Sequence, residues 1–72
     1  MRLALAESLR QRRVARHLSQ VEFARQIGSS QSRVAKMEAA DPSVTIDLLL
    51  RSLLALGVSR RVLAGILARS AA

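Results

Sequence analysis

The chain has 72 residues; half are apolar and only Phe23 is aromatic. A chain of this length holds one domain, residues 1–72, and its aliphatic composition favours packed helices over strands, which need more β-branched and aromatic residues in alternation. The absence of cysteine excludes disulfides and thiolate metal sites, and the net charge of +7 indicates a polyanionic partner.

The charge is unevenly distributed along the chain. Residues 1–36 carry eight basic side chains against two acids, whereas residues 37–72 carry four basic side chains against three acids. The second part is also rich in leucine. This asymmetry suggests that one surface meets a polyanion and another meets protein.

The first predicted helix covers about residues 3–16, where Leu5 and Leu9 repeat at helical spacing. Its polar side carries arginines, namely Arg10, Arg12 and Arg16.

Two short helices are predicted next. Ser19 is a favourable N-cap, and Glu22 three residues later completes a capping box. The helix that follows ends at Gly28, which can adopt the left-handed conformation. Ser30 caps a third helix over about residues 31–39.

Two further helices complete the expected all-α, five-helix fold. Pro42 interrupts the chain after the third helix. Thr45 can cap a fourth helix over residues 46–56, and Ser59 a fifth over about residues 60–68.

Residues 19–38 have the pattern of a helix-turn-helix. Ala24 is small where two helices must cross closely, and Gly28 provides the tight turn between them. Apolar residues fill the angle between the helices, namely Ile27, Val34 and Met37. Capping box, small residue, turn glycine and apolar spacing all indicate the same motif.

From about Leu5 to Leu67 the chain resembles the Cro/repressor (Xre-like) helix-turn-helix family. The resemblance is carried by Leu18-Ser19-Gln20, Phe23-Ala24, Ile27-Gly28, Ser30 and the stretch Val34 to Glu38. It implies a five-helix DNA-binding domain, and typical members are dimeric transcriptional repressors of phages, plasmids and bacteria. The chain departs from the family where glycine is common, at His17 and at Ala39-Ala40.

The third helix is predicted to enter the major groove, which displays a distinct pattern of donors and acceptors for each base pair. Gln31 and Ser32 lie in its first turn, Lys36 follows one turn later, and Arg33 lies beside them. Glutamine suits adenine, and lysine or arginine suits guanine. By resemblance, Gln31, Ser32 and Lys36 occupy the base-reading positions of the family.

A second group of residues is expected at the DNA backbone. By resemblance, the positions of Ser19, Gln20 and Ser30 touch phosphates. Ser43 and Val44, ahead of the fourth helix, could present backbone amides to another phosphate. Two arginines of the first helix are plausible phosphate partners, namely Arg10 and Arg16.

Arg13 and Glu38 match an ion pair of the family, between the first helix and the end of the third. We expect a partly buried pair that fixes how these two helices dock. The alternative is an exposed pair that contributes about 0–1 kcal/mol.

The leucine-rich fourth helix has more apolar positions than one buried side requires, so we expect residues 46–68 to serve both the core and a homodimer. The expected interface residues are Leu53, Leu56, Val58, Val62 and Ile66. Such a dimer would place its recognition helices about 34 Å apart on an inverted-repeat operator.

Catalysis, cofactors and a metal site are not expected, because His17 is the only histidine and no acid pair has suitable spacing. The sequence therefore predicts a cytoplasmic repressor that binds double-stranded DNA. One alternative is an antitoxin that also binds a toxin protein. Another is a scaffold at a membrane surface; no apolar run is long enough for a signal peptide or a membrane span.

Overall fold

Small hydroxyl side chains open four of the helices in the computed structural model, which describes residues 1–71. The hydroxyl oxygens accept hydrogen bonds from backbone amides three residues later. The pairs are Ser19 with Glu22 at 3.0 Å, Ser30 with Arg33 at 3.2 Å, Thr45 with Leu48 at 3.1 Å, and Ser59 with Val62 at 3.2 Å. Each of these bonds satisfies one amide that has no partner inside its helix.

The described residues form five helices, as the sequence predicted: α1 (Arg2–Ala15), α2 (Gln20–Gln26), α3 (Gln31–Glu38), α4 (Ile46–Ala55) and α5 (Arg60–Ala71). Most ends agree with the predicted ones within one or two residues. Helix α5 continues three residues beyond the predicted end, since alanine and arginine favour helix.

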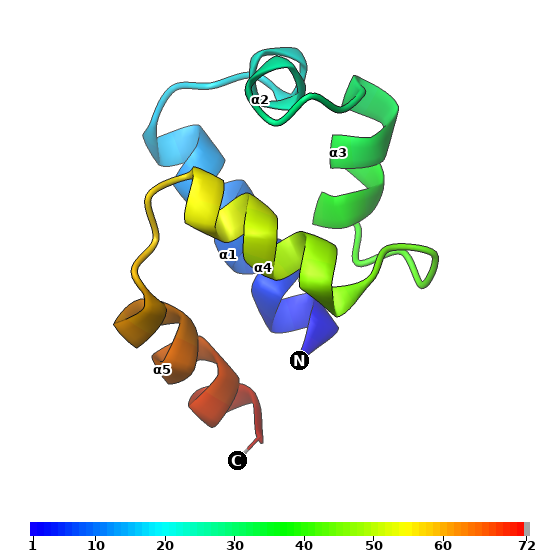
Figure 1. Ribbon diagram of the computed structural model, residues 1–72. Coiled ribbons are helices and arrows are strands. Elements are labelled where there is room, and N and C mark those ends of the chain that lie inside the picture. Colours follow the sequence, from blue (N-terminus) through cyan, green and yellow to red (C-terminus); the bar gives the residue numbers. More distant parts are fainter. Residues whose placement is uncertain (72) are drawn as a thin grey trace.

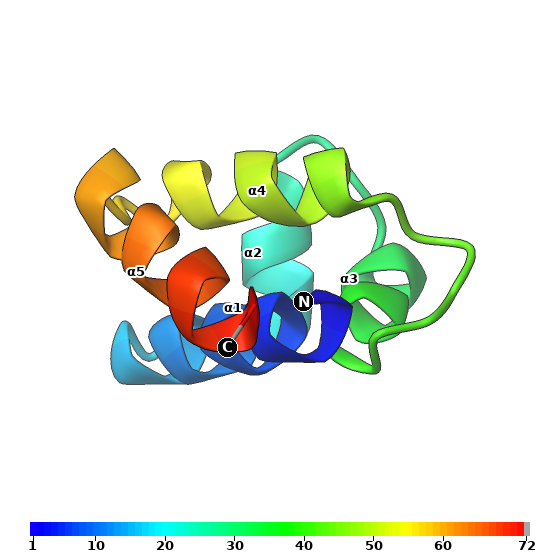
Figure 2. The same cartoon turned by 90° about the horizontal axis from the view of Figure 1, so that it is seen from below.

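Helices α1 and α4 lie together in the middle of the molecule, with α2 and α3 at one end and α5 at the other (Figures 1 and 2). The core between them is aliphatic apart from one aromatic ring. The largest fully buried side chains come from the first four helices: Phe23, Leu5, Leu9, Met37, Leu49, Leu53 and Val34. The helix-turn-helix therefore rests on a platform made by α1 and α4.

A buried hydroxyl joins α4 to the underside of α3. Ser52 is 3% exposed, and its Oγ lies 3.4 Å from the sulfur of Met37. Met37 is itself fully buried. Because a buried hydroxyl without a partner is costly, this contact favours one position of α3 on the core.

Two residues with side chains occupy backbone positions that suit glycine. His17 has φ 57° after α1, and Ala40 has φ 56° after α3. After each of these residues, the next backbone amide donates to a carbonyl of the preceding helix. Leu18 donates to the Arg13 carbonyl, and Asp41 donates to the Lys36 carbonyl. The turn that ends each helix therefore requires a left-handed backbone conformation at this residue.

Candidate nucleic-acid interface

Helix α3 has one buried side and one exposed side. Val34 and Met37 are fully buried and hold the helix against the core. The polar residues that the sequence placed at base edges are all exposed, namely Gln31, Ser32, Arg33 and Lys36. Among the described residues, no other element covers this polar side, so it is open to a large partner.

The turn between α2 and α3 fixes the angle at which α3 projects. Gly28, at φ 64°, reverses the chain, and the Ser29 amide donates to the Ala24 carbonyl at 2.8 Å. Before the turn, Ser19 and Glu22 form a reciprocal capping box at the start of α2. Both short helices therefore begin and end at well-satisfied backbone positions.

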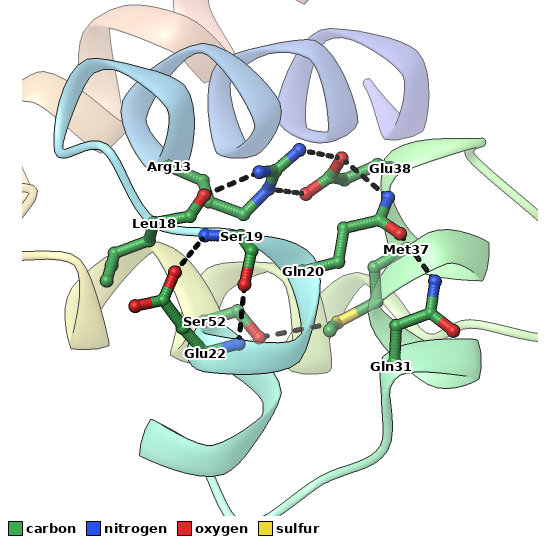
Figure 3. A network of polar contacts seen from close by, with 9 residues as sticks. All are labelled: Arg13, Leu18, Ser19, Gln20, Glu22, Gln31, Met37, Glu38 and Ser52. Carbon is green, nitrogen blue, oxygen red and sulfur yellow. Dashed lines mark hydrogen bonds and ion pairs between the residues drawn. The ribbon is translucent and has the colours of Figure 1, made fainter.

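Arg13 of α1 and Glu38 of α3 form the predicted ion pair (Figure 3). Arg13 donates from Nε to Oε2 and from Nη2 to Oε1, the latter at 2.9 Å, and its Nη1 donates to the Leu18 carbonyl at 2.6 Å. The two side chains are 11% and 6% exposed. The hydrogen bond to Glu38 raises the pKa of Arg13 further above its ordinary value.

Two glutamines extend this ion pair to the exposed side of α3 (Figure 3). Gln20 donates from Nε2 to Oε1 of Glu38 at 3.2 Å. Gln31 donates from Nε2 to Oε1 of Gln20 at 2.8 Å. A continuous series of polar contacts therefore runs from α1 through α2 to the first residue of α3.

The contact between Gln20 and Glu38 was not predicted from the sequence. Gln20 was placed at the DNA backbone by resemblance. Its second partner depends on how α2 packs against the last turn of α3, which helical periodicity does not specify. The sequence offered only an indirect indication of this contact. Gln20 directly follows an N-cap, and a side chain at the start of a helix lies close to side chains of the helix that crosses it.

Ser19 and Ser30 keep one hydrogen-bonding function for a partner. Their hydroxyl oxygens accept from the backbone amides of α2 and α3. A hydroxyl also has one hydrogen to donate, and both residues are exposed. Capping and a contact to a phosphate oxygen are therefore compatible at each serine.

The two arginines proposed for phosphate contact lie on either side of Arg13, about 120° apart around the axis of α1. At about 100° per residue, Arg10 and Arg16 are each rotated by roughly 60° from Arg13, in opposite directions. Arg16 donates from Nη1 to the Leu56 carbonyl at 3.1 Å, which places it at the end of α4. Arg10 lies on the other side and is exposed. Arg16 thus stabilises a helix end, and its contact with a phosphate stays a prediction, like that of Arg10.

The loop before α4 does not offer the free amides that the sequence suggested. The Ser43 amide donates to Oδ1 of Asp41 at 2.8 Å, and the Val44 amide donates to the Asp41 carbonyl at 3.0 Å. The expectation that these amides bind a phosphate is therefore wrong. The Asp41 side chain folds the turn onto itself, and only the Ser43 side chain remains exposed.

The residues expected at a dimer interface are mostly part of the chain's own core. Leu53 is fully buried, and Leu56, Val58 and Ile66 are at most 5% exposed. Val62 is half-buried against the same core. These five residues are packed into the chain's own core, so they cannot form a free apolar surface, and the expectation is corrected.

Four of the five acids are engaged by hydrogen bonds or ion pairs within the described residues. Hydrogen bonds from Ser19 lower the pKa of Glu22, and hydrogen bonds from Ser43 lower the pKa of Asp41. Glu38 pairs with Arg13, and Asp47 pairs with Arg51. With acids occupied in this way, most of the twelve cations have no acidic partner among residues 1–71, and the protein attracts polyanions.

Two other findings concern the described part of the chain. No group of three or more side chains from histidine, cysteine, aspartate or glutamate could hold a metal ion there. Nor does any helix in that part have the length and apolar character needed to cross a membrane.

The fold and the exposed side of α3 define a helix-turn-helix DNA-binding domain. A sequence profile of the helix-turn-helix family of the Cro/C1 (Xre-like) type matches residues 9–63, and the chain belongs to this family. The family consists of DNA-binding transcription regulators, and the chain is a regulator of this general kind. Comparisons with curated proteins and with solved structures give no significant match.

Proposed function

We propose that the chain is a sequence-specific repressor that inserts α3 into the major groove of an operator. The supporting observation is the exposed polar side of α3, where Gln31 is held by Gln20 at 2.8 Å. A side chain held before binding loses less conformational freedom when it meets a base. Gln31 faces adenine in this proposal, while Ser32 and Lys36 face neighbouring base pairs.

Phosphate contacts position the domain on the duplex. We assign them to Arg10 of α1, the half-buried Gln20 side chain, and the hydroxyl hydrogens of Ser19, Ser30 and Ser43. Arg33, exposed beside the reading positions, reaches either a phosphate or a guanine. These contacts supply affinity without sequence preference, whereas the base contacts supply specificity.

We further propose that two copies bind one inverted-repeat operator. In such a complex the two recognition helices occupy successive major grooves about 34 Å apart. Occupation of the operator represses transcription by excluding the polymerase. Because the expected interface residues are buried within the chain, we propose that the copies pair through a small surface and mainly when DNA holds them together.

Selection of bound sequences from random duplex DNA tests the proposal. The expected result is a symmetric site of two half-sites with at least one conserved adenine in each. Gln31→Ala should reduce the preference for that adenine by about 1–3 kcal/mol. Gln11→Ala is the matched control, because Gln11 is exposed on α1 in the groove facing α5, away from α3. Binding without sequence preference in the unaltered protein would contradict the proposal.

A further inference from the structure

The hydrogen bonds that join Gln31, Gln20 and Glu38 have a direction, because each residue donates to the next. Each glutamine amide has a donor end, the NH₂ group, and an acceptor end, the carbonyl oxygen, and the two ends have nearly the same shape. Rotation of an amide by a half-turn therefore exchanges a donor for an acceptor without a change in packing. What Gln31 presents to a base depends on which way its amide is turned.

The Glu38 carboxylate determines the orientation of the first amide. A carboxylate accepts hydrogen bonds and has no hydrogen to donate. Two N–H groups of Arg13 hold it, and its side chain is only 6% exposed. Gln20 must therefore turn its Nε2 toward Glu38, as it does at 3.2 Å.

The orientation of Gln20 then determines that of Gln31. With its Nε2 directed at Glu38, Gln20 presents Oε1 to α3. Gln31 therefore turns its Nε2 toward Gln20 and donates to that oxygen at 2.8 Å (Figure 3). Gln31 keeps its Oε1 and one remaining N–H for another partner. It thus offers one acceptor and one donor in a fixed order.

This order distinguishes the two purines. In the major groove adenine offers an acceptor at N7 and a donor at N6, whereas guanine offers acceptors at both N7 and O6. The free Oε1 of Gln31 suits adenine N6 and is repelled by guanine O6. A reversed amide would place its NH₂ group at the same point, where it would donate to guanine O6 with its own oxygen facing N7, and would meet adenine N6 donor to donor.

We propose that Glu38 is a positioning residue for specificity: it fixes the amides of Gln20 and Gln31 so that Gln31 reads adenine and rejects guanine. The inference rests on the proposed DNA-reading function of α3. It gives the ion pair a second role, because the same carboxylate that docks α1 on α3 also sets the polarity of the base contact.

The test measures relative affinity for adenine and guanine at the base pair that Gln31→Ala identifies. Glu38→Gln replaces the carboxylate by an amide that can donate as well as accept, so neither glutamine keeps a fixed orientation. The adenine-to-guanine ratio at that base pair should fall by at least about fivefold. Ratios at the other base pairs should stay unchanged, which a general loss of structure would not produce.

The exchange variant Gln20→Glu/Glu38→Gln supplies a rescue with the same net charge. A carboxylate at position 20 only accepts, so Gln31 must again donate its Nε2. The adenine preference should return even if overall affinity falls, because the new carboxylate lies near phosphates. A ratio that stays relaxed in the exchange variant, or one that never relaxes in Glu38→Gln, overturns the proposal.

If circular dichroism shows that Glu38→Gln does not fold, a variant that keeps Glu38 decides the matter. Gln20→Met provides no acceptor for Gln31 and should relax the ratio. An unchanged ratio in Gln20→Met overturns the proposal. A protein without any sequence preference would instead contradict the proposed function, so the two failures are distinct.

Discussion

Ala40 and His17 show how single residues limit the stability of this fold. Both hold positive φ angles, at 56° and 57°, in turns that end a helix. A side chain in this conformation costs about 1–2 kcal/mol, which glycine avoids. The family often has glycine at both points. The sequence alone located the departure at His17 correctly, but for the second turn it left Ala39 and Ala40 undistinguished.

Replacing Ala40 by glycine should therefore stabilise the protein. We expect Ala40→Gly to raise the free energy of unfolding by about 1 kcal/mol, after the added chain entropy of glycine is subtracted. Urea unfolding followed by circular dichroism measures the change. The matched control is Ala39→Gly, at φ −84°, where no left-handed strain exists and glycine should not stabilise. A loss of stability in Ala40→Gly would contradict the assigned strain.

The ion pair between Arg13 and Glu38 provides a second prediction at this scale. With side chains 11% and 6% exposed, either residue left alone is a nearly buried charge. Arg13→Met and Glu38→Met should each destabilise by about 3 kcal/mol. The double variant should cost much less than the sum, since no charge is left without a partner. A coupling energy below about 1 kcal/mol in the double-mutant cycle would mean that the pair contributes no more than a solvent-exposed ion pair.

At the scale of elements, capping residues carry most of what could be predicted. Ser19, Ser30, Thr45 and Ser59 were identified as N-caps from the sequence, and each accepts the backbone hydrogen bond of a cap. These signals are local, so they do not depend on how helices pack. The loop before α4 was interpreted less well, because the Asp41 side chain takes up the Ser43 amide by a local contact that competes with any ligand.

The capping box of α2 predicts an acid-sensitive element. The Ser19 amide donates to Glu22 at 2.9 Å and lowers the pKa of that carboxylate. A lowered pKa in the folded state contributes stability that is present above the ordinary value of 4.5 and is lost as the pH falls through the folded value. In Glu22→Gln, stability should decline less steeply below pH 4.5 than in the unaltered protein. Equal slopes in acid urea titrations would contradict this.

Asp47 is the matched control for that measurement. It also lies in the first turn of a helix and pairs with Arg51, but both side chains are more than 70% exposed. An exposed pair of this kind contributes little. Asp47→Asn should therefore leave the decline of the unfolding free energy at acid pH nearly unchanged.

At the scale of the whole molecule, the sequence identified the buried residues of the helix-turn-helix but assigned several core residues of α4 and α5 to a dimer interface. The apolar pattern of α4 showed that nearly all sides must be covered. It could not show that Leu53, Leu56 and Val58 are covered within the chain itself. A second copy was therefore expected where the chain covers itself. The same limit explains why the contact of Gln20 with Glu38 was missed: both depend on how separate helices pack against one another.

The position of each cation relative to α3 predicts how salt affects DNA binding. Arg10 lies on the proposed interface, whereas Arg61, also exposed, lies on α5 at the opposite end of the molecule (Figure 2). Arg10→Ala should reduce the slope of log K against log salt by about 0.9, the value for one neutralised phosphate. Arg61→Ala should leave the slope unchanged. Equal losses in the two variants would mean that charge alone, without position, governs binding.

Charge and burial together predict that pairing depends on DNA. The expected apolar interface is covered, and α5 presents Arg60 and Arg61 at its exposed start, so two free copies repel one another more than they attract. Neutralisation of charge by a duplex removes much of this repulsion. Without DNA, sedimentation in low salt should show a monomer. On a duplex whose half-sites are about 34 Å apart, two copies should bind cooperatively.

A duplex with one half-site moved by about half a helical turn is the control for that experiment, because it places the two copies on different sides of the DNA. Each copy should then bind independently, with unchanged affinity for its own half-site. Cooperativity that survives the shift would show that the copies attract each other without the geometry of the operator. A stable dimer in the absence of DNA would contradict the prediction directly, and would mean that the remaining exposed apolar residues, such as Leu54 at 45% exposure, form a stronger surface than their area suggests.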